Sequence, residues 1–471
     1  MVQNELRWSD QSAQFKPSHY DIILAFIIER VNRMKNQNGS CLLLKRLNQI
    51  RVLRNFSNFG IGFIFPLCLT LCFLTPNLIF SQTWSDPVII SKPASNSCSD
   101  FIIDKYKLMH CVWQIVLSPT HKQIFYSKSE NLGETWTDPV PITNNPALRT
   151  DNPQIVADTS GNLYVCYEYD CILSMKICYV KLNYGDTIWS QPIEIGHGLS
   201  PRMVVDKNNR VYFFWSTGIE KYRYIEDGLL SDIFTMCSGP VTGCLLDDIA
   251  VDQQNTLHCI GTQFIENDGQ GAWFTYDDNN WTPYVALSEK TFWESAISLN
   301  SIGEPSFVWR QSVSKDFTLT ATYFSECKND TIQPSVLLGQ KTTYPEIALD
   351  YTDKPHVVEC QQTDSNYQLV HRHRTSQGWL SQVVEENKIW YIQNNLISLD
   401  NSLFWVYNRA DTIINPLTGT YYALVLFRKL ELQPGLIENS MNEQLRVFPN
   451  PFSERLTIEF LEPGNDKCIL S

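Results

Sequence analysis

Seven apolar runs along this chain each end at an Asp or Asn, and a second apolar run follows across a short polar turn. The residues one and three positions before each of these anchors are apolar in all seven copies, which is the period of two expected for one face of a strand. The turns carry residues such as Gly161 and Asn208 that suit a tight hairpin. The seven anchors are Asp104, Asp158, Asp206, Asp252, Asn300, Asp350 and Asp400.

The spacing of the anchors predicts the architecture. They recur every 46 to 54 residues, and periods of about 40 to 50 residues are typical of propeller blades and solenoids. Trp-led segments after the hairpins, such as 135–143 and 188–196, predict outer strands. The same kind of segment, 83–91, precedes the first copy and in a ring would complete the last one. We therefore predict an all-β, seven-bladed β-propeller over residues 83–430, closed by its N-terminal strand.

Composition agrees with a folded β domain and narrows the partners. Aromatic residues make up 12% of the 471 residues and charged residues only 18%, and aromatic side chains suit half-buried sheet surfaces. A propeller of this kind accounts for most of the chain length as a single domain. The net charge of -13 opposes phosphate, so no nucleic-acid partner is expected.

The most apolar stretch lies before the repeats, at Phe59–Phe80, and basic residues precede it. A basic flank followed by an apolar core predicts a signal peptide over 59–82 and a secreted or cell-surface protein. The alternative is a membrane anchor through 59–80, which is long enough to span a bilayer but contains Pro66 and Pro76. Residues 1–58 then form an N-terminal extension, and a true start at Met34 would shorten it.

The C-terminal end carries a second targeting pattern. A polar segment at 431–444 suits a linker. The run Val447–Ser453, VFPNPFS, followed by the alternating Leu456–Phe460, resembles the opening of a type IX secretion C-terminal sorting domain. The resemblance implies export through the outer membrane by the type IX secretion machinery. It covers 445–471, which is a partial sorting domain because such domains continue through further strands.

A third pattern lies in the first repeat. Residues 129–136, SENLGETW, resemble the Asp box (BNR repeat) of sialidase-like propellers, with Asn131 in place of the usual Asp. In that family Ser129, Asn131 and Gly133 would shape a turn and Trp136 would pack the blade. The resemblance therefore implies a structural role away from the face that binds ligands.

Ligands of propellers bind where the inner strands begin, at the channel mouth. Equal offsets from the anchors identify polar residues four positions before them and just after the second strands. Carboxylates can divide acid and base roles and Arg can bind a carboxylate through two hydrogen bonds, so this set suits an acidic or polar sugar. The ligand-binding candidates are Asp100, Glu168, Arg202, Asp248, Arg310, Glu346 and Arg409.

The sialidase resemblance does not extend to the catalytic pattern. Sialidases carry an Arg-Ile-Pro motif where this chain has Asn152-Pro153, Ser200-Pro201 and Tyr344-Pro345. The three arginines among the candidates could form a different triad across alternate blades. We expect a protein that binds an extracellular glycan or protein at the channel mouth. The alternatives are a sialidase-like glycoside hydrolase or a lyase acting on a polysaccharide, and a non-catalytic scaffold or adhesin.

No cofactor or metal is expected. The sequence has no GxSxG, HExxH, EF-hand or phosphate-binding loop. The nearest cysteine pairs, Cys98 with Cys111, Cys171 with Cys178 and Cys237 with Cys244, have disulfide-compatible rather than zinc-type spacing. His371 and His373 alternate on a strand and are interpreted as an exposed polar face.

Overall fold

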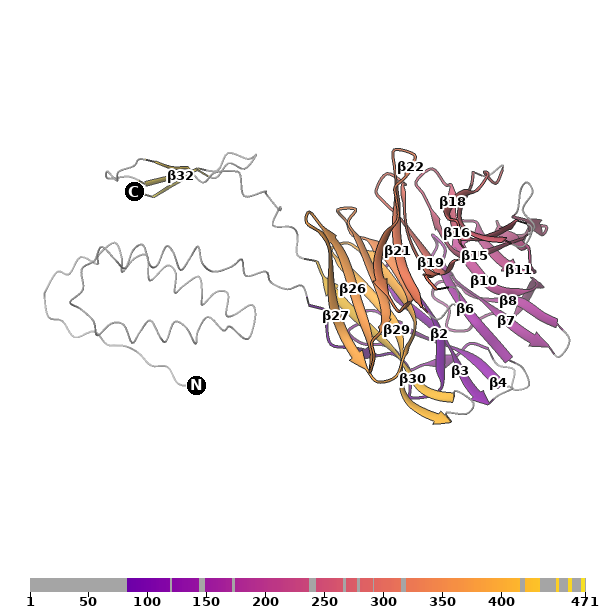
Figure 1. The fold of residues 1–471 in the computed structure, drawn as a ribbon. Helices are drawn as coiled ribbons and strands as arrows, with labels where there is room; N and C mark the ends of the chain where they lie inside the picture. The colour runs from indigo at the N-terminus through magenta and orange to yellow at the C-terminus, as the bar shows by residue number, and fades with distance from the viewer. Residues whose placement is uncertain are drawn as a thin grey trace, which may run out of the picture. The chain divides into compact units, whose positions relative to one another are not determined.

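The structure is a computed structural model, and the strands that it describes form an all-β propeller (Figure 1). It describes residues 83–118, 121–143, 149–171, 174–236, 243–265, 268–277, 280–290, 292–314, 319–415 and 420–432, and the short strands at 446–448, 456–459 and 467–470. Those ranges contain no helix, and so none with the length and apolar character to cross a membrane. The predicted extension 1–58 and the predicted signal or anchor 59–82 lie outside the described residues.

Seven inner strands surround the centre of the propeller. Each one contacts the next, and the last contacts the first, so they form a closed ring. In chain order they are β2 (Asn96–Ile103), β6 (Arg149–Ala157), β10 (Leu199–Val205), β15 (Gly243–Val251), β19 (Phe292–Leu299), β24 (Thr342–Leu349) and β28 (Tyr391–Leu399).

Each inner strand pairs antiparallel with a second strand, which pairs with a third. The second strands are β3 (Met109–Ser118), β7 (Leu163–Cys171), β11 (Val211–Ser216), β16 (Leu257–Ile265), β20 (Pro305–Ser312), β25 (Pro355–Gln362) and β29 (Ser402–Asn415). The third strands are β4 (His121–Ser129), β8 (Ser174–Leu182), β12 (Glu220–Glu226), β17 (Asp268–Tyr276), β21 (Thr320–Lys328), β26 (Tyr367–Thr375) and β30 (Thr420–Glu431). The outer strands are β1 (Val88–Ile89), β5 (Val140–Pro141), β9 (Ile193–His197), β13 (Leu229–Leu230), β14 (Phe234–Thr235), β18 (Val285–Ser288), β22 (Thr331–Ile332), β23 (Val336–Gln340) and β27 (Gly378–Asn387).

The division into sheets differs from the prediction of seven separate blades. Strand pairing gives five propeller sheets of four or five strands and one sheet of eight strands. The eight-stranded sheet arises because Lys122 of β4 pairs in parallel with Arg149 of β6. Side chains strengthen this bridge: the Thr150 hydroxyl donates to the Lys122 carbonyl over 2.9 Å, and Lys122 and Arg149 both pair with Asp151. The prediction of seven separate blades is therefore wrong, because two of the expected blades are joined in one sheet.

The anchor residues shape the hairpins between inner and second strands. In six of the seven copies, the side-chain oxygen of the anchor accepts a hydrogen bond from the backbone N–H four residues later, over 2.7 to 3.0 Å. In the same six turns the residue three positions after the anchor has a positive φ, between 61° and 91°. A type I turn followed by a left-handed residue has this geometry. Asp or Asn recurs at the anchor because its side chain caps the turn.

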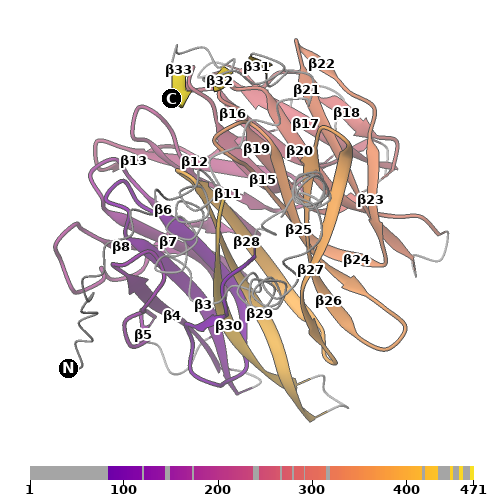
Figure 2. The same ribbon diagram turned by 90° about the vertical axis from the view of Figure 1, so that its left-hand side faces the viewer.

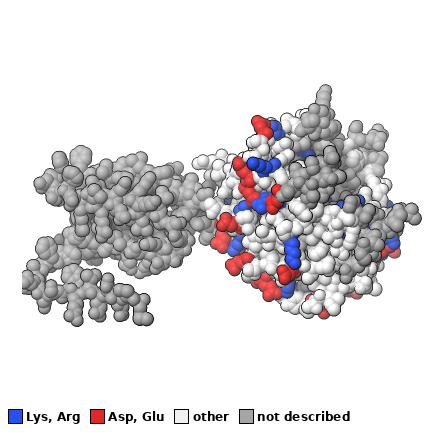
Figure 3. Space-filling view, turned by 90° about the horizontal axis from the view of Figure 1, so that it is seen from below, with Lys and Arg blue, Asp and Glu red and all other residues white. Residues whose placement is uncertain are grey.

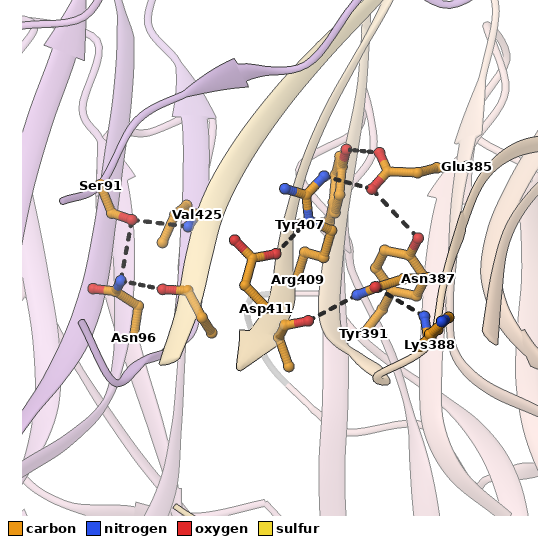
Figure 4. A network of polar contacts seen from close by, with 12 residues as sticks. Ser91, Asn96, Glu385, Asn387, Lys388, Tyr391, Tyr407, Arg409, Asp411 and Val425 are labelled. Atoms are coloured by element: carbon orange, nitrogen blue, oxygen red, sulfur yellow. Dashed lines mark hydrogen bonds and ion pairs between the residues drawn. The ribbon is translucent and has the colours of Figure 1, made fainter. Parts of the chain in front are cut away.

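The N-terminal strand closes the ring, as the sequence predicted. Val88 and Ile89 of β1 pair antiparallel with Phe427 and Leu426 of β30, so the last sheet contains the first strand. Beside this pairing, the Ser91 hydroxyl accepts the Val425 N–H over 2.9 Å (Figure 4). Figure 2 shows β29 and β30 between the early strands β3 and β4 and the late strands β26 and β27.

Trp84 packs the closing segment against two neighbouring sheets. It is 8% exposed and packs edge-on against Trp405 of β29 and His371 of β26, with ring centroids 5.1 and 5.3 Å apart. It belongs to the apolar cluster that fills the space between the β24 and β28 sheets. The closing segment is therefore held by a buried side chain as well as by the two residue pairs between β1 and β30.

The Asp-box turn packs against β30 of the last sheet. Ser129 donates to the Asn131 amide oxygen over 2.9 Å, and that oxygen also accepts the Thr135 N–H over 2.9 Å. Gly133 has a φ of 87°, and a Cβ there would lie 2.1 Å from the ring of Phe427. Trp136 packs against the same ring at 5.8 Å. The turn thus contacts β30, the strand to which the N-terminal segment pairs.

The C-terminal segment that carries the sorting-domain pattern forms a sheet of its own. It contains β31 (Arg446–Phe448), β32 (Leu456–Glu459) and β33 (Lys467–Leu470), paired antiparallel in chain order. The Pro449-Asn450-Pro451 part of the motif lies outside the described residues.

The cysteines of the three nearest pairs differ in their state. Cys98, Cys111 and Cys178 are free thiols. Cys98 and Cys111 lie on β2 and β3, where Cys111 faces the buried core. Cys244 is disulfide-bonded, and the cysteine nearest to it in sequence, Cys237, lies outside the described residues.

We expect Trp84→Ala to lower the free energy of unfolding by about 3 to 5 kcal/mol, because it removes a large buried side chain at the ring closure. Urea unfolding followed by Trp fluorescence measures this. Ile188→Ala is the matched control, since Ile188 is 82% exposed and its truncation should change stability by less than about 0.5 kcal/mol. Equal effects of the two substitutions would contradict a structural role for the closing segment.

Candidate functional site

All seven inner strands are bulged near their first residues. In each, the register with the second strand shifts at this point. In five of them a non-glycine residue six positions before the anchor has a φ between 49° and 55°. A bulge turns the following side chains away from the regular pleat. In six strands the first paired residue after the shift is the one four positions before the anchor, which includes Asp100, Arg202, Asp248 and Glu346.

Two of these carboxylates accept hydrogen bonds from backbone N–H groups of the next inner strand. Asp100 on β2 accepts the N–H of Ile155 on β6 over 2.7 Å. Asp248 on β15 accepts the N–H of Ile297 on β19 over 2.9 Å. At Ile155 and Ile297 no strand pairs with this side of β6 or β19, because β4 reaches β6 only at Arg149, and a buried N–H needs an acceptor. These carboxylates therefore join neighbouring sheets at the channel wall.

Four of the predicted candidates lie together at the centre of the ring. Glu346 on β24 interacts electrostatically with Asp248 and Asp100, and Asp100 with Arg202. Of the strands β2, β10, β15 and β24, only β10 and β15 are neighbours in the ring, so Glu346 meets Asp100 and Asp248 across the channel. Burial, followed by the neighbouring carboxylates, raises the pKa of Glu346 well above its ordinary range. Burial also raises the pKa of Asp100 and of Asp248 to about 6.

Arg202 is the cation in this group. Its guanidinium donates to the backbone carbonyls of Asp247 and, over 3.0 Å, of Pro201. Asp247 itself accepts hydrogen bonds from the hydroxyl and N–H of Ser295 over 2.7 and 3.3 Å. Arg202 is thus positioned by carbonyls and shares its charge among the surrounding carboxyl groups.

The other candidates serve contacts between sheets. Glu168 accepts the N–H of Ser200, the bulge residue of β10, over 2.7 Å. Arg310 pairs with Glu294 over 2.7 Å, and Glu294 accepts the N–H of the bulge residue Tyr344 over 2.7 Å. These residues lie near the mouth but outside the central group.

Arg409 belongs to the polar network that supports ring closure (Figure 4). It donates to Glu385 of β27 and to Asp411, both over 2.8 Å. Glu385 also accepts from Tyr407 and Arg428, and Arg428 donates to the carbonyl of Ser85 in the closing segment. The three candidate arginines therefore have separate partners and do not converge as a triad.

The sequence did not reveal Glu220, at the start of β12. It is 1% exposed, and neither carboxyl oxygen has a hydrogen-bond partner. Burial is the main cause that raises the pKa of Glu220 to about 8, and Arg202 and Asp247 are its charged neighbours. Gln263 on β16 is also buried with both amide atoms unpartnered. The only sequence signal for Glu220 is its position two residues before Tyr222, on the face of β12 that packs against the β15 sheet.

A cavity of about 470 Å³ lies between the β20 and β25 strands, at the end of the propeller where the inner strands begin. Its size falls within the range of small-ligand sites. Polar side chains predominate, and two cations, Arg310 and Lys341, line it with the ring of Tyr367. Lys341 pairs with the exposed Asp364 over 3.0 Å. The remaining lining residues are Leu319, Thr320, Thr343, Cys360, Gln362 and Thr363.

Surface charge gives no basic binding face in the view of Figure 3. There, Lys and Arg side chains lie among Asp and Glu side chains. Several partly exposed cations of the described residues are paired with carboxylates, as Arg374 is with Glu326.

His371 and His373 do not form the exposed strand face expected from sequence. Their rings stack with that of His356 on β25, with centroids 5.2 to 5.7 Å apart, and His371 is 1% exposed. His356 lies 2.9 Å from His371 and 3.4 Å from the anchor carboxylate of Asp350. The strand face is buried because the sheet that ring closure completes packs on it through Trp84. Among the described residues, no group of three or more His, Cys, Asp or Glu side chains is arranged to hold a metal.

Comparison with known proteins gives likeness in fold only. No protein-family model matches the chain, and no curated protein matches it. A Hadza microbial sialidase is 10% identical over 72% of this chain and 66% of its own, just under two thirds, with a TM-score of 0.44. A mutant of the NanB sialidase from Streptococcus pneumoniae is 11% identical over 73% of this chain and 70% of its own, with a TM-score of 0.43.

A polysaccharide lyase, an ulvan lyase solved with a bound uronic acid and sulfated rhamnose sugar, is also similar. It is 10% identical over 73% of this chain and 94% of its own, with a TM-score of 0.49. These neighbours are sialidases and other propeller proteins. Identities this low, with TM-scores below 0.5, assign no activity to this chain.

Acid should destabilise the protein through the histidine cluster. Burial lowers the pKa of His371 well below its usual range, and His356 and His373 add to this effect. An unfolded histidine titrates near pH 6.5, so below that pH the unfolded chain binds more protons and stability falls. Urea unfolding at pH 7.5 and 5.0 should show a loss that is smaller in His371→Phe by about 1 to 2 kcal/mol.

His197→Phe is the control for the histidine cluster. His197 lies on β9 and its side chain is 58% exposed, so this substitution should keep the loss of the unmodified protein. The same loss in His371→Phe as in the unmodified protein would show that the cluster does not cause it.

Proposed function

We propose that this chain is a seven-unit, sialidase-like propeller that binds an extracellular glycan at its channel mouth, without catalysis. The observation that carries the proposal is the polar cavity of about 470 Å³ between β20 and β25. The count of seven treats the eight-stranded sheet as two units, because each half has its own inner strand, bulge and capped turn.

The lining of the cavity suits a hydroxyl-rich ligand. Arg310 and Lys341 donate hydrogen bonds, Asp364 accepts them, and Gln362 and Thr363 can do both. Tyr367 adds a ring with a polar hydroxyl, which gives an apolar body and a polar tip. A few polar groups around a cavity of this size are typical of sites that orient a small ligand.

The enzyme alternative has a weaker basis. A glycoside hydrolase needs two carboxyl groups that flank the bond to be cleaved. The carboxylates of Asp100, Asp248 and Glu168 instead accept backbone N–H groups of the next inner strand, and Arg202, Arg310 and Arg409 do not converge on one site, since each has a different partner. An extracellular protein as the ligand, or a scaffold or adhesin role, is the remaining alternative.

A glycan array probed with the full chain tests the binding proposal. We expect selective retention of one glycan class, and no release of reducing sugar from the bound glycans. Lys341→Ala should weaken binding about tenfold, because it removes a charged hydrogen-bond donor worth about 1.5 to 3 kcal/mol. Gln362→Trp, which fills the cavity from an exposed position, should abolish it.

Lys207→Ala is the control for Lys341→Ala. Lys207 is exposed in a hairpin turn at the opposite end of its inner strand, so binding should be unchanged. Cleavage of the bound glycan would replace the proposal by the enzyme alternative, and an array without any bound glycan would reject it.

We also propose that the protein is exported and that 445–471 act as a type IX-like sorting signal. The sequence pattern and the antiparallel sheet of β31 to β33 support this. In a bacterium with type IX secretion, a chain that ends at residue 444 should accumulate in the periplasm, whereas the full chain reaches the surface or medium. Immunoblots of the fractions measure this, and equal distributions would refute the role.

A further inference from the structure

The outer strand β27 is longer than the outer strands of the other units. It has ten residues, whereas the others have two to five. It pairs with β26 from Gly378 to Asn387 and is the last strand of its sheet, at the rim of the propeller (Figure 1). Within the described part of the chain, no other segment forms backbone hydrogen bonds with its far edge. Proteins usually keep such edges short, because an exposed edge can pair with another chain.

β27 also lacks most of the features that protect an edge from pairing. It contains no Pro, Lys or Arg. Two of its apolar side chains are exposed, Leu380 at 53% and Val383 at 48%. Its two carboxylates, Glu385 and Glu386, and the single bulge in its pairing with β26, at Val384, lie together near its C-terminal end. The stretch 378–383 is therefore a regular and uncharged edge that can accept another strand.

Both ends of β27 are fixed to neighbouring sheets. Trp379 packs edge-on against Phe324 of β21, with ring centroids 4.9 Å apart. Near the other end, Glu385 accepts hydrogen bonds from Tyr407 and Arg409, each over 2.8 Å (Figure 4). The edge is thus already ordered as a strand, so pairing does not require further ordering of its backbone.

A second copy of this chain is the partner that matches this edge. It brings an edge of the same length that is equally ordered, whereas a flexible peptide would lose conformational entropy on pairing. Antiparallel pairing places the carboxylates of the two copies at opposite ends of the contact. Parallel pairing in register would place them side by side, where like charges oppose each other. Symmetric contacts between identical surfaces are also the commonest arrangement in soluble dimers.

We propose that β27 is a dimerisation edge, at which two copies of the chain pair antiparallel through residues 378–383 across a two-fold axis. The two four-stranded sheets then form one continuous sheet. Because the pairing reverses the strand direction, the inner strands β24 of the two copies begin at opposite ends of this sheet. The two channel mouths therefore face opposite directions. The dimer does not depend on the identity of the ligand.

Analytical ultracentrifugation of the full chain over a range of concentrations tests the proposal. We expect a reversible equilibrium between monomer and dimer. Val383→Lys should weaken the dimer about tenfold or more, because a lysine beside an edge opposes strand pairing. Val336→Lys is the matched control, since Val336 is 44% exposed on the five-residue outer strand β23, and it should leave the equilibrium unchanged. Circular dichroism melting checks that both variants keep the fold.

A chemical cross-link tests the geometry without relying on the stability of Val383→Lys. In antiparallel strands the diagonal neighbours are about 8 Å apart, so a short bis-maleimide should join two copies of Leu380→Cys. Leu337→Cys is the matched control, since Leu337 is 47% exposed on β23. The unmodified chain measures the background from its own cysteines.

Three results would overturn the proposal. The first is a chain that stays monomeric at high micromolar concentration. The second is a dimer that Val383→Lys and Val336→Lys weaken equally. The third is cross-linking of Leu380→Cys that does not exceed that of Leu337→Cys. A dimer that is weakened selectively by Val383→Lys and cross-linked selectively through Leu380→Cys would establish the β27 contact.

Discussion

The constraint on which this structure depends is the inner edge of the seven inner strands. Most of this edge has no strand to pair with, so its N–H groups need other acceptors where the seven strands meet. The chain solves this with side chains of the preceding unit: Asp100 accepts from β6, Glu168 from β10 and Asp248 from β19. The bulges at the start of each inner strand present both the N–H groups and the carboxylates at this level.

That solution explains why the channel is acidic. Backbone N–H groups are donors, so their side-chain partners are acceptors, and carboxylates are strong ones. Arg202 compensates part of the negative charge, while Glu346 and Glu220 exceed what the backbone requires. A structural requirement, the pairing of backbone N–H groups, therefore sets part of the charge of the channel.

The repeat pattern predicted much of the fold because it reflects local interactions. The period of two at the anchors follows from strand geometry, and Asp or Asn recurs because its side chain caps a turn within the next four residues. The equal offsets then led to the four residues that converge in the channel. Arg409 did not join them, because it stands one residue beyond Asn408, the position that the offset identifies, and adjacent side chains of a strand point to opposite faces; Arg409 donates to Glu385 and Asn408 accepts from Ser99 of β2. The alternation of polar residues along the strand misled for His371, which is buried against Trp84, nearly 290 residues earlier in the chain.

The sequence by itself determined the strands, the capped turns, the closing segment and the residues at equal distance from each anchor, because all of these depend on neighbours within a hairpin or on repetition. Only the tertiary structure decided which polar groups share the channel, which arginines are already bound, and that two units join into one eight-stranded sheet. Those outcomes depend on contacts between units, where a single bridge or a single buried ring changes the partner of a side chain and leaves no periodic signal in the sequence.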